Sequence, residues 1–168
     1  MEKSTMRIAF TGPESSGKST LANWFSAFFS IPLATEFART YLVNAPTYES
    51  SDLLKIAQGQ IALWPEGTFV ADTELHVIQI WSQEKFQQVD PQILDALQRQ
   101  KFDHYFLCAP DIPWEADPLR ENPTDRDRLF KLYKHELMTY NRSYTILSGD
   151  LHSRQELIKV TISSICKR

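Results

Sequence analysis

The chain has 168 residues, of which 42% are hydrophobic and 23% are charged, and its formal net charge is −3. These values are ordinary for a globular protein with one sizeable core, so we expect residues 1–168 to form a single domain. The weakly acidic balance, without a block of lysines and arginines, argues against a nucleic-acid partner. No apolar segment has the length of a membrane span or the pattern of a secretion signal, and two cysteines make no disulfide framework. We therefore expect a cytoplasmic protein with no membrane partner.

The first informative segment is residues 6–29. Residues 6–11 are short and mostly apolar, which predicts a buried strand. Residues 20–29 carry apolar side chains at helical spacing, which predicts a helix. Between them, residues 12–19 read GPESSGKS and fit the phosphate-binding pattern G-x-x-x-x-G-K-[ST]. A strand before this pattern and a helix after it favour a nucleotide-binding loop over an ordinary turn.

Each residue type in this loop suits a phosphate. Gly12 and Gly17 allow the backbone to bring its N–H groups close to an anion at a helix N-terminus. Lys18 is expected to reach the β- and γ-phosphates, and the Ser19 hydroxyl to hold Mg²⁺. Glu14 is negatively charged, so we expect its side chain to face away from the phosphates. The residues predicted to bind a nucleoside triphosphate, which the resemblance given below implies is ATP, are Gly12, Glu14, Ser15, Ser16, Gly17, Lys18, Ser19 and Thr20.

Strands and helices alternate along the rest of the chain. The pattern predicts further strands at 31–35, 67–72, 104–109 and 144–147. It predicts helices at 48–64, 73–86, 91–99, 124–140 and 153–166, the fourth of them starting at a capping pair formed by Thr124 and Asp127. Several strands are apolar throughout, so we expect an α/β fold in which helices cover both faces of a parallel five-stranded sheet.

Candidate substrate and metal residues follow two of these strands, at the edge of the sheet where parallel folds place their ligands. Asp72 ends an apolar strand and is expected to order Mg²⁺, although it could instead cap the next helix. Glu36 is a further candidate functional residue at this edge, and Arg39 lies one helical turn further on. A simple surface ion pair is the alternative for these two. Trp81 is a candidate to stack on a flat substrate ring, or else a core residue.

Three arginines lie in residues 112–128, a segment that follows the fourth predicted strand and reaches into the first turns of the next predicted helix. Arginines on a mobile segment can close over phosphates, neutralise charge and exclude water. We therefore expect this segment to be a lid, with Arg120 and Arg126 as catalytic residues and Arg128 as a further candidate. Because acidic residues are interleaved with them, a solvated loop held by salt bridges is the alternative.

Taken together, these motifs resemble a known family. The segments GPESSGKSTL at 12–21, EFAR at 36–39, ADTE at 71–74, WS at 81–82 and PWEADPLR at 113–120 are similar, in order, to the nicotinamide riboside kinase domain of bacterial NadR-type proteins. The resemblance implies the P-loop kinase fold. It also implies Mg²⁺-dependent transfer of the γ-phosphate of ATP to the 5′-hydroxyl of nicotinamide riboside, giving nicotinamide mononucleotide.

The combined interpretation assigns roles along the site. The catalytic residues are Lys18, Glu36, Asp72, Arg120 and Arg126; the substrate contacts are Glu36, Arg39, Asp72 and Trp81; the metal ligands are Ser19 and Asp72. Only five residues precede the first expected strand, so we expect no adenylyltransferase activity of the kind that often precedes this kinase domain. Thr35 stands where a family member has a ring-stacking tryptophan, and the segment between Gln60 and Asp72 is short. Another nucleoside or nucleotide acceptor, or a regulatory ATPase that acts as a switch, remains the alternative.

Overall fold

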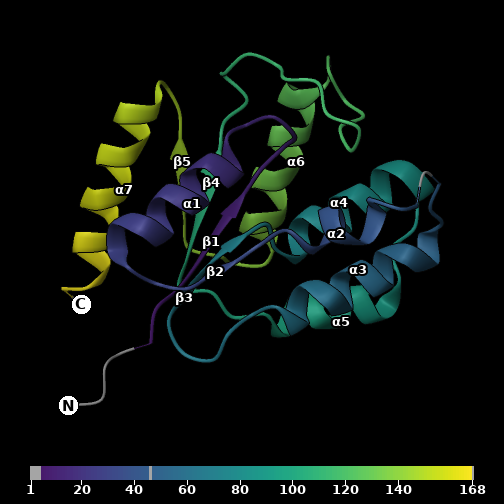
Figure 1. Ribbon diagram of the computed structural model, residues 1–168, viewed down its shortest axis with the longest axis horizontal. Helices are drawn as coiled ribbons and strands as arrows, with labels where there is room; N and C mark the ends of the chain where they lie inside the picture. The colour runs from purple at the N-terminus through teal and green to yellow at the C-terminus, as the bar shows by residue number, and fades with distance from the viewer. Residues whose placement is uncertain (1–4, 46, 168) are drawn as a thin grey trace.

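The computed structural model describes residues 5–45 and 47–167 and contains a five-stranded, fully parallel sheet (Figure 1). Its strands are β1 (Arg7–Thr11), β2 (Leu33–Ala34), β3 (Phe69–Asp72), β4 (His104–Cys108) and β5 (Tyr144–Leu147). They lie in the order β2-β3-β1-β4-β5, so β1 is central, with β2 and β3 on one side of it and β4 and β5 on the other. Ligands of open parallel sheets bind where the order reverses in this way, beyond the carboxyl ends of the strands. The loop that follows β1 lies at that point.

Helices connect the strands as the sequence predicted, with boundaries shifted by a few residues. They are α1 (Lys18–Phe29), α2 (Phe37–Leu42), α3 (Ser50–Ala62), α4 (Leu75–Phe86), α5 (Pro91–Arg99), α6 (Arg126–Thr139) and α7 (Leu151–Ile165). The short helix α2 was not predicted as an element of its own. The capping pair of Thr124 and Asp127 was wrong, because Asp125 is the N-cap of α6 and makes no side-chain cap hydrogen bond. None of the described helices is long and apolar enough to cross a membrane.

Alternating side chains of β1 divide the core into two layers. Ile8 and Phe10 pack in one buried cluster with α1 and α7, whereas Ala9 belongs to a cluster on the opposite face with α4 and α6. Figure 1 shows α1 and α7 together on one side of the sheet and α6 on the other. Burying a side chain the size of phenylalanine contributes about 1.5–3 kcal/mol. Both faces of the central strand are therefore covered, which fixes the loop that it carries.

A third cluster is built by α2, α3, α4 and α5 beside the sheet. The helices α2 and α3 approach closely in it, because a side-chain carbon added to Gly59 would lie 2.1 Å from the ring of Phe37. Only glycine allows this approach. The short helix α2 is thereby held against α3, and the residue before it, Glu36, is held at the edge of the sheet.

Candidate active site

The phosphate loop has the backbone conformation that its two glycines permit. Gly12 has φ 130°, and a side-chain carbon there would lie 2.7 Å from the carbonyl oxygen of Cys108 in the neighbouring strand. Gly17 has φ 88° and precedes the first residue of α1. The ammonium group of Lys18 folds back over the loop and donates to the carbonyl oxygens of Gly12 and Pro13 at 2.8 and 2.7 Å. The loop thus forms a curved backbone with a cation across it.

A buried arginine from the last helix, α7, holds the phosphate loop through hydrogen bonds to the backbone. Arg154 is only 2% exposed, and its guanidinium donates to the carbonyl oxygens of Ser16 at 2.7 Å and Ala109 at 3.0 Å, and pairs with Asp111. It ties α7 and the end of β4 to the phosphate loop. The sequence analysis missed it, although a signal existed: Arg154 lies four residues before Ile158, on the apolar stripe of the helix.

A second buried network supports the strand that enters the loop. The carboxylate of Glu74 is fully buried and accepts from the hydroxyl of Thr11 at 2.7 Å, from the backbone N–H of His76 at 2.9 Å and from the side chain of Gln100 at 2.7 Å. Burial works to raise the pKa of Glu74, but the interactions with His76 and Gln100 outweigh it and hold the pKa below its ordinary value. The carboxylate therefore stays ionised and can accept all of these bonds.

Asp72 lies at the end of β3, as predicted, and is 5% exposed. The N-cap of α4 is Glu74, whose side chain accepts from the N–H of His76, so the alternative role of Asp72 as a helix cap was wrong. Burial raises the pKa of Asp72, and the charge of Glu36 adds to the rise, whereas Ser19 lowers it. Among the described residues no hydrogen bond reaches its buried Oδ1 atom. A buried carboxylate oxygen without a partner suits a cation.

These two side chains, Asp72 and Ser19, fit what Mg²⁺ requires. The ion usually takes one or two protein oxygens and fills its remaining positions with water and substrate phosphates. Across residues 5–45 and 47–167, no group of three or more histidine, cysteine or acidic side chains could hold a metal by itself. A carboxylate and a hydroxyl beside a phosphate loop are therefore a chemically suitable set for Mg²⁺ bound together with a nucleotide.

Glu36 and Arg39 form an ion pair that reaches further than the sequence indicated. The Nε atom of Arg39 donates to Glu36 at 2.9 Å, and its Nη1 atom donates to Asp117 at 2.9 Å. Glu36 and Arg39 both line the main cavity, whereas Asp117 lies in the connection between β4 and α6. The pair therefore joins the wall of the cavity to the predicted lid.

The backbone around Glu36 is held by a residue that the sequence analysis missed. Gln60 of α3 is 1% exposed; its amide nitrogen donates to the carbonyl oxygen of Thr35 at 3.0 Å and its oxygen accepts the N–H of Phe37 at 2.9 Å. One side chain thus binds the residue before Glu36 and the residue after it. The available signal was a glutamine at helical spacing from the apolar residue Ile56.

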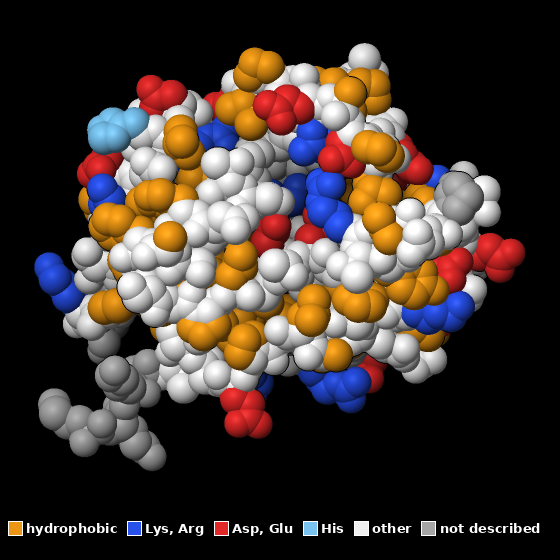
Figure 2. Space-filling view, viewed as in Figure 1, with side chains coloured by type: hydrophobic (Ala, Val, Ile, Leu, Met, Phe, Trp, Pro, Cys, Tyr) orange, Lys and Arg blue, Asp and Glu red, His pale blue; other side chains and the backbone are white. Residues whose placement is uncertain are grey.

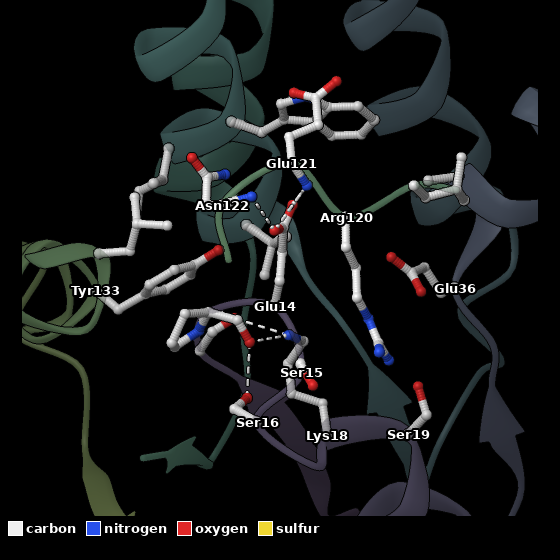
Figure 3. A pocket seen from close by; sticks show the side chains of 18 of the residues that line it. Glu14, Ser15, Ser16, Lys18, Ser19, Glu36, Arg120, Glu121, Asn122 and Tyr133 are labelled. Atoms are coloured by element: carbon white, nitrogen blue, oxygen red, sulfur yellow. Dashed lines mark hydrogen bonds between the residues drawn. The ribbon is translucent and has the colours of Figure 1, made fainter. Parts of the chain in front are cut away.

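The predicted lid, residues 112–128, falls partly in a connection without helix or strand at residues 109–125 and partly in the first turn of α6, which contains Arg126 and Arg128. We call residues 109–125 the lid segment. Arg120 points into the cavity in Figure 3, and its guanidinium donates to the carbonyl oxygen of Glu115. Arg126 donates to the carbonyl oxygens of Ser15 at 2.7 Å and Ile112 at 2.9 Å, which joins α6 to the phosphate loop.

Two further charged residues occupy different places from those expected of phosphate ligands. Arg128 is half exposed and pairs with Glu84 and Asp125, outside the phosphate loop. The carboxylate of Glu14 accepts the backbone N–H groups of Glu121 at 3.0 Å and Asn122 at 2.9 Å in the lid segment (Figure 3). Its side chain thus binds the lid segment, and its direction agrees with the expectation that it faces away from the phosphates.

A cavity of about 380 Å³ joins the phosphate loop to an apolar compartment between α2, α4 and α6. A hollow lined by acidic and basic side chains is visible on the face in Figure 2. Of the predicted residues, Asp72, Arg126 and Arg128 do not line the cavity. The predicted residues that do line it are Gly12, Glu14, Ser15, Ser16, Gly17, Lys18, Ser19, Thr20, Glu36, Arg39, Trp81 and Arg120. The apolar compartment is lined by Ala38, Val77, Ile80, Trp81, Leu119, Leu129 and Tyr133.

The AAA domain family AAA_28 matches residues 7–154, which include the phosphate loop, the acidic strand ends and the lid segment. The chain belongs to this family. Among curated proteins it is similar to the trifunctional NAD biosynthesis/regulator protein NadR of Salmonella typhimurium and of Escherichia coli, each 28% identical over 132 residues. The match covers 72% of this chain and 32% of each relative. The AAA domain described here therefore spans about a third of the length of these curated relatives.

Solved structures share the fold. NadR in complex with NAD and AMP-PNP superposes with a TM-score of 0.76 at 17% identity, over 93% of this chain and 48% of that one. NadR in complex with NR gives 0.75 at 18% identity, over 93% and 50%. A deoxyadenosine kinase from M. mycoides gives 0.67 at 16% identity, over 95% and 100%. These matches confirm the predicted P-loop kinase fold and the resemblance to NadR-type proteins.

Proposed function

We propose that this AAA domain is an ATP-dependent kinase that phosphorylates the 5′-hydroxyl of nicotinamide riboside. The observation that carries the proposal is the single cavity that joins the phosphate loop to an apolar compartment, with Glu36 and Trp81 in its wall. A kinase needs its two substrates side by side in a space from which water can be excluded. The NadR structure with NR supports the choice of this acceptor among nucleosides.

The phosphate loop would bind the triphosphate of ATP. Its N–H groups and the N-terminus of α1 attract anions, and Lys18 would exchange the carbonyl oxygens of Gly12 and Pro13 for phosphate oxygens. Arg120, which already points into the cavity, would neutralise charge on the transferred group. Because phosphoryl transfer has a loose transition state, positioning and charge are what these residues must supply.

Ser19 and Asp72 would hold Mg²⁺ with the nucleotide. When bound there, the ion neutralises charge on the phosphate oxygens of ATP. The chain contributes the carboxylate and the hydroxyl, and the buried position of Asp72 keeps bulk water away from that side. Burial raises the pKa of Asp72 because it disfavours the negative charge, and a cation beside the carboxylate would offset that cost.

The acceptor would lie in the apolar compartment. Glu36 would accept hydrogen bonds from the ribose or the attacking 5′-hydroxyl, and Arg39 would hold the carboxylate in place. The nicotinamide ring of the riboside is a flat cation, which suits the face of an indole such as Trp81. The same cavity is lined by side chains of both charges: carboxylates at Glu14, Glu36, Glu84, Glu115 and Glu121, and cations at Lys18, Arg39, Lys85 and Arg120.

An assay of ADP release over a panel of acceptors tests the proposal. The panel should hold nicotinamide riboside, deoxyadenosine, thymidine and thymidine monophosphate, with product masses measured in parallel. We expect the highest kcat/KM for nicotinamide riboside and a product heavier by one phosphate. A preference for another nucleoside would keep the kinase and change the acceptor. Steady ATP hydrolysis with no phosphorylated acceptor would contradict the kinase and favour the regulatory ATPase.

A further inference from the structure

Glu121 of the lid segment is bound from two sides. Its backbone N–H donates to the carboxylate of Glu14 in the phosphate loop at 3.0 Å. Its own carboxylate accepts from the hydroxyl of Tyr48 at 3.0 Å and pairs with Lys85 of α4. One residue of the lid therefore contacts both the loop that would hold ATP and the wall that would hold the acceptor.

The contact with Tyr48 leads directly to the acceptor compartment. The indole N–H of Trp81 donates to the hydroxyl of Tyr48 at 2.9 Å, and the two rings pack edge to face with centroids 5.2 Å apart. Trp81 itself lines the cavity. Three hydrogen bonds thus connect Trp81, through Tyr48 and Glu121, to the carboxylate of Glu14.

The direction of these bonds is fixed by chemistry. An indole nitrogen can only donate, so the Tyr48 hydroxyl must use a lone pair toward Trp81. Its one hydrogen is then free for the carboxylate of Glu121. Burial raises the pKa of Tyr48, which keeps this hydrogen on the hydroxyl. The backbone N–H of Glu121 can in turn only donate, and the carboxylate of Glu14 can only accept. Each group has one possible role in the series.

We propose that Glu121, through Tyr48, couples binding of the acceptor against Trp81 to closure of the lid over the phosphate loop, so that the two substrates bind cooperatively. This inference rests on the proposed function, because it places the acceptor ring beside Trp81. An acceptor that orders Trp81 and Tyr48 also orders Glu121, and with it the N–H groups bound by Glu14. By reciprocity, ATP that orders the loop tightens binding of the acceptor by the same factor.

Titration of AMP-PNP with and without saturating nicotinamide riboside tests the coupling. In the wild-type chain we expect the Kd of AMP-PNP to fall at least about fivefold when the riboside is present. Tyr48→Phe keeps the ring and the ion pair of Glu121 with Lys85 but removes the hydroxyl, so the ratio of the two Kd values should fall toward one. The Kd of AMP-PNP alone should stay within about twofold, which a general structural defect would not achieve. Tyr144→Phe in β5, remote from the cavity, is the matched control and should keep the wild-type ratio.

Two results would overturn the inference: a wild-type ratio of one, or a wild-type ratio retained in Tyr48→Phe. Glu14→Ala, which removes the acceptor of the Glu121 and Asn122 N–H groups, is the second variant, and in the double variant the two losses should not add, because both interrupt one series of bonds. Failure of the proposed function is a separate result, seen as no phosphorylated riboside from the wild-type chain. Amide hydrogen exchange then decides the coupling without an acceptor: with AMP-PNP bound, Tyr48→Phe should speed exchange at Glu121 and Asn122. Unchanged exchange at these amides would contradict the link.

Discussion

The phosphate loop is held by different contacts from those of the acceptor wall, the part of the cavity lining that contains Glu36, Arg39 and Trp81. The loop is held from below by buried side chains that bind backbone or buried groups: Arg154, 2% exposed, donates to the carbonyl oxygen of Ser16, and the fully buried Glu74 accepts from Thr11. Such contacts have few alternative partners, because an unsatisfied buried group costs about 1–3 kcal/mol. The ATP half of the site is therefore fixed as the chain folds.

The acceptor half is completed by bonds between side chains at the surface. The side chains of Arg39 and Asp117 are 44% and 22% exposed, and that of Glu121 is 41% exposed where it pairs with Lys85. Exposed ion pairs contribute only about 0–1 kcal/mol each, so they can open and close at little cost. The comparison teaches that buried contacts hold the phosphate loop and, through Gln60, the backbone of Glu36, whereas the contacts between the acceptor side chains and the lid segment are exposed. Substitutions should accordingly separate nucleotide binding from acceptor use.

The largest effect is expected at Lys18. Lys18→Ala removes the cation from the phosphate loop, and kcat should fall by on the order of 10³-fold. The melting temperature should change little, because the ammonium group contacts only loop carbonyl oxygens. Exposed Lys131→Ala, on α6, is the control and should keep wild-type turnover. Near-normal kcat in Lys18→Ala would contradict the assignment of the loop.

Asp72→Asn should lower Mg²⁺-dependent activity by on the order of 10²-fold, since a metal ligand loses its charge. The same change should stabilise the ligand-free protein. The pKa of Asp72 is raised on folding, so the ionised carboxylate opposes folding once the pH rises above the ordinary value for aspartate, and an amide removes that penalty. The melting temperature at pH 7 without Mg²⁺ should rise, by about 2–4 °C for each kcal/mol gained in the free energy of unfolding. A lower melting temperature would show that the carboxylate has a structural role.

The arginines of the lid region should differ from one another, because only one points into the cavity. Arg120→Gln should lower kcat by about 10–100-fold, because the variant lacks the positive charge that would neutralise the transferred group. Arg128→Gln removes the same charge from a side chain that pairs with Glu84 and Asp125, and turnover should stay within about twofold. Equal losses in both variants would mean that the whole region acts through its net charge, and not through one directed side chain.

The smallest effect is expected on the free energy of unfolding at acid pH, through His104 in β4 of the sheet. Burial lowers the pKa of His104 to about 4, whereas a histidine in an unfolded chain titrates near 6.5. Between these values the unfolded chain binds a proton that the folded one does not, so stability is lost as the pH falls below about 6.5. From pH 7 to pH 5 the wild-type chain should lose about 1 kcal/mol more than His104→Gln, allowing for partial screening of the ring by solvent. Urea unfolding at both pH values measures this difference. An equal loss of unfolding free energy in the wild-type chain and in His104→Gln would contradict it.

The fold and the conformation of the phosphate loop could be predicted because their signals are local. Gly12 and Gly17 are required by backbone angles, and Lys18 and Ser19 follow them at fixed spacing before a helix. The end of β3 at Asp72 could likewise be read from an apolar segment that stops at an acid. Physical requirements that act within ten residues leave a pattern in a single sequence.

The supports of the site could not be predicted in the same way. Arg154 reaches Ser16 across 138 positions of sequence, and Glu14 reaches Asn122 across 108. Each of these residues has an ordinary place in its own element, and only the folded chain shows its partner. Gln60 interrupts an apolar stripe, which signals a buried polar group but not what it binds. Contacts of this kind come from tertiary packing, and the geometry of the lid depends on them.

The most direct test of a separable site is a pair of measurements on Glu36→Gln. The substitution keeps the size of the side chain and removes the charge that pairs with Arg39, at the end of the acceptor wall. We expect the Kd of AMP-PNP, measured by titration without acceptor, to stay within about twofold of wild type. We expect kcat/KM for nicotinamide riboside to fall by at least about tenfold, the effect of losing a hydrogen bond to a charged group. Equal losses in both measurements, or no loss in acceptor kinetics, would contradict the division of this site into two halves.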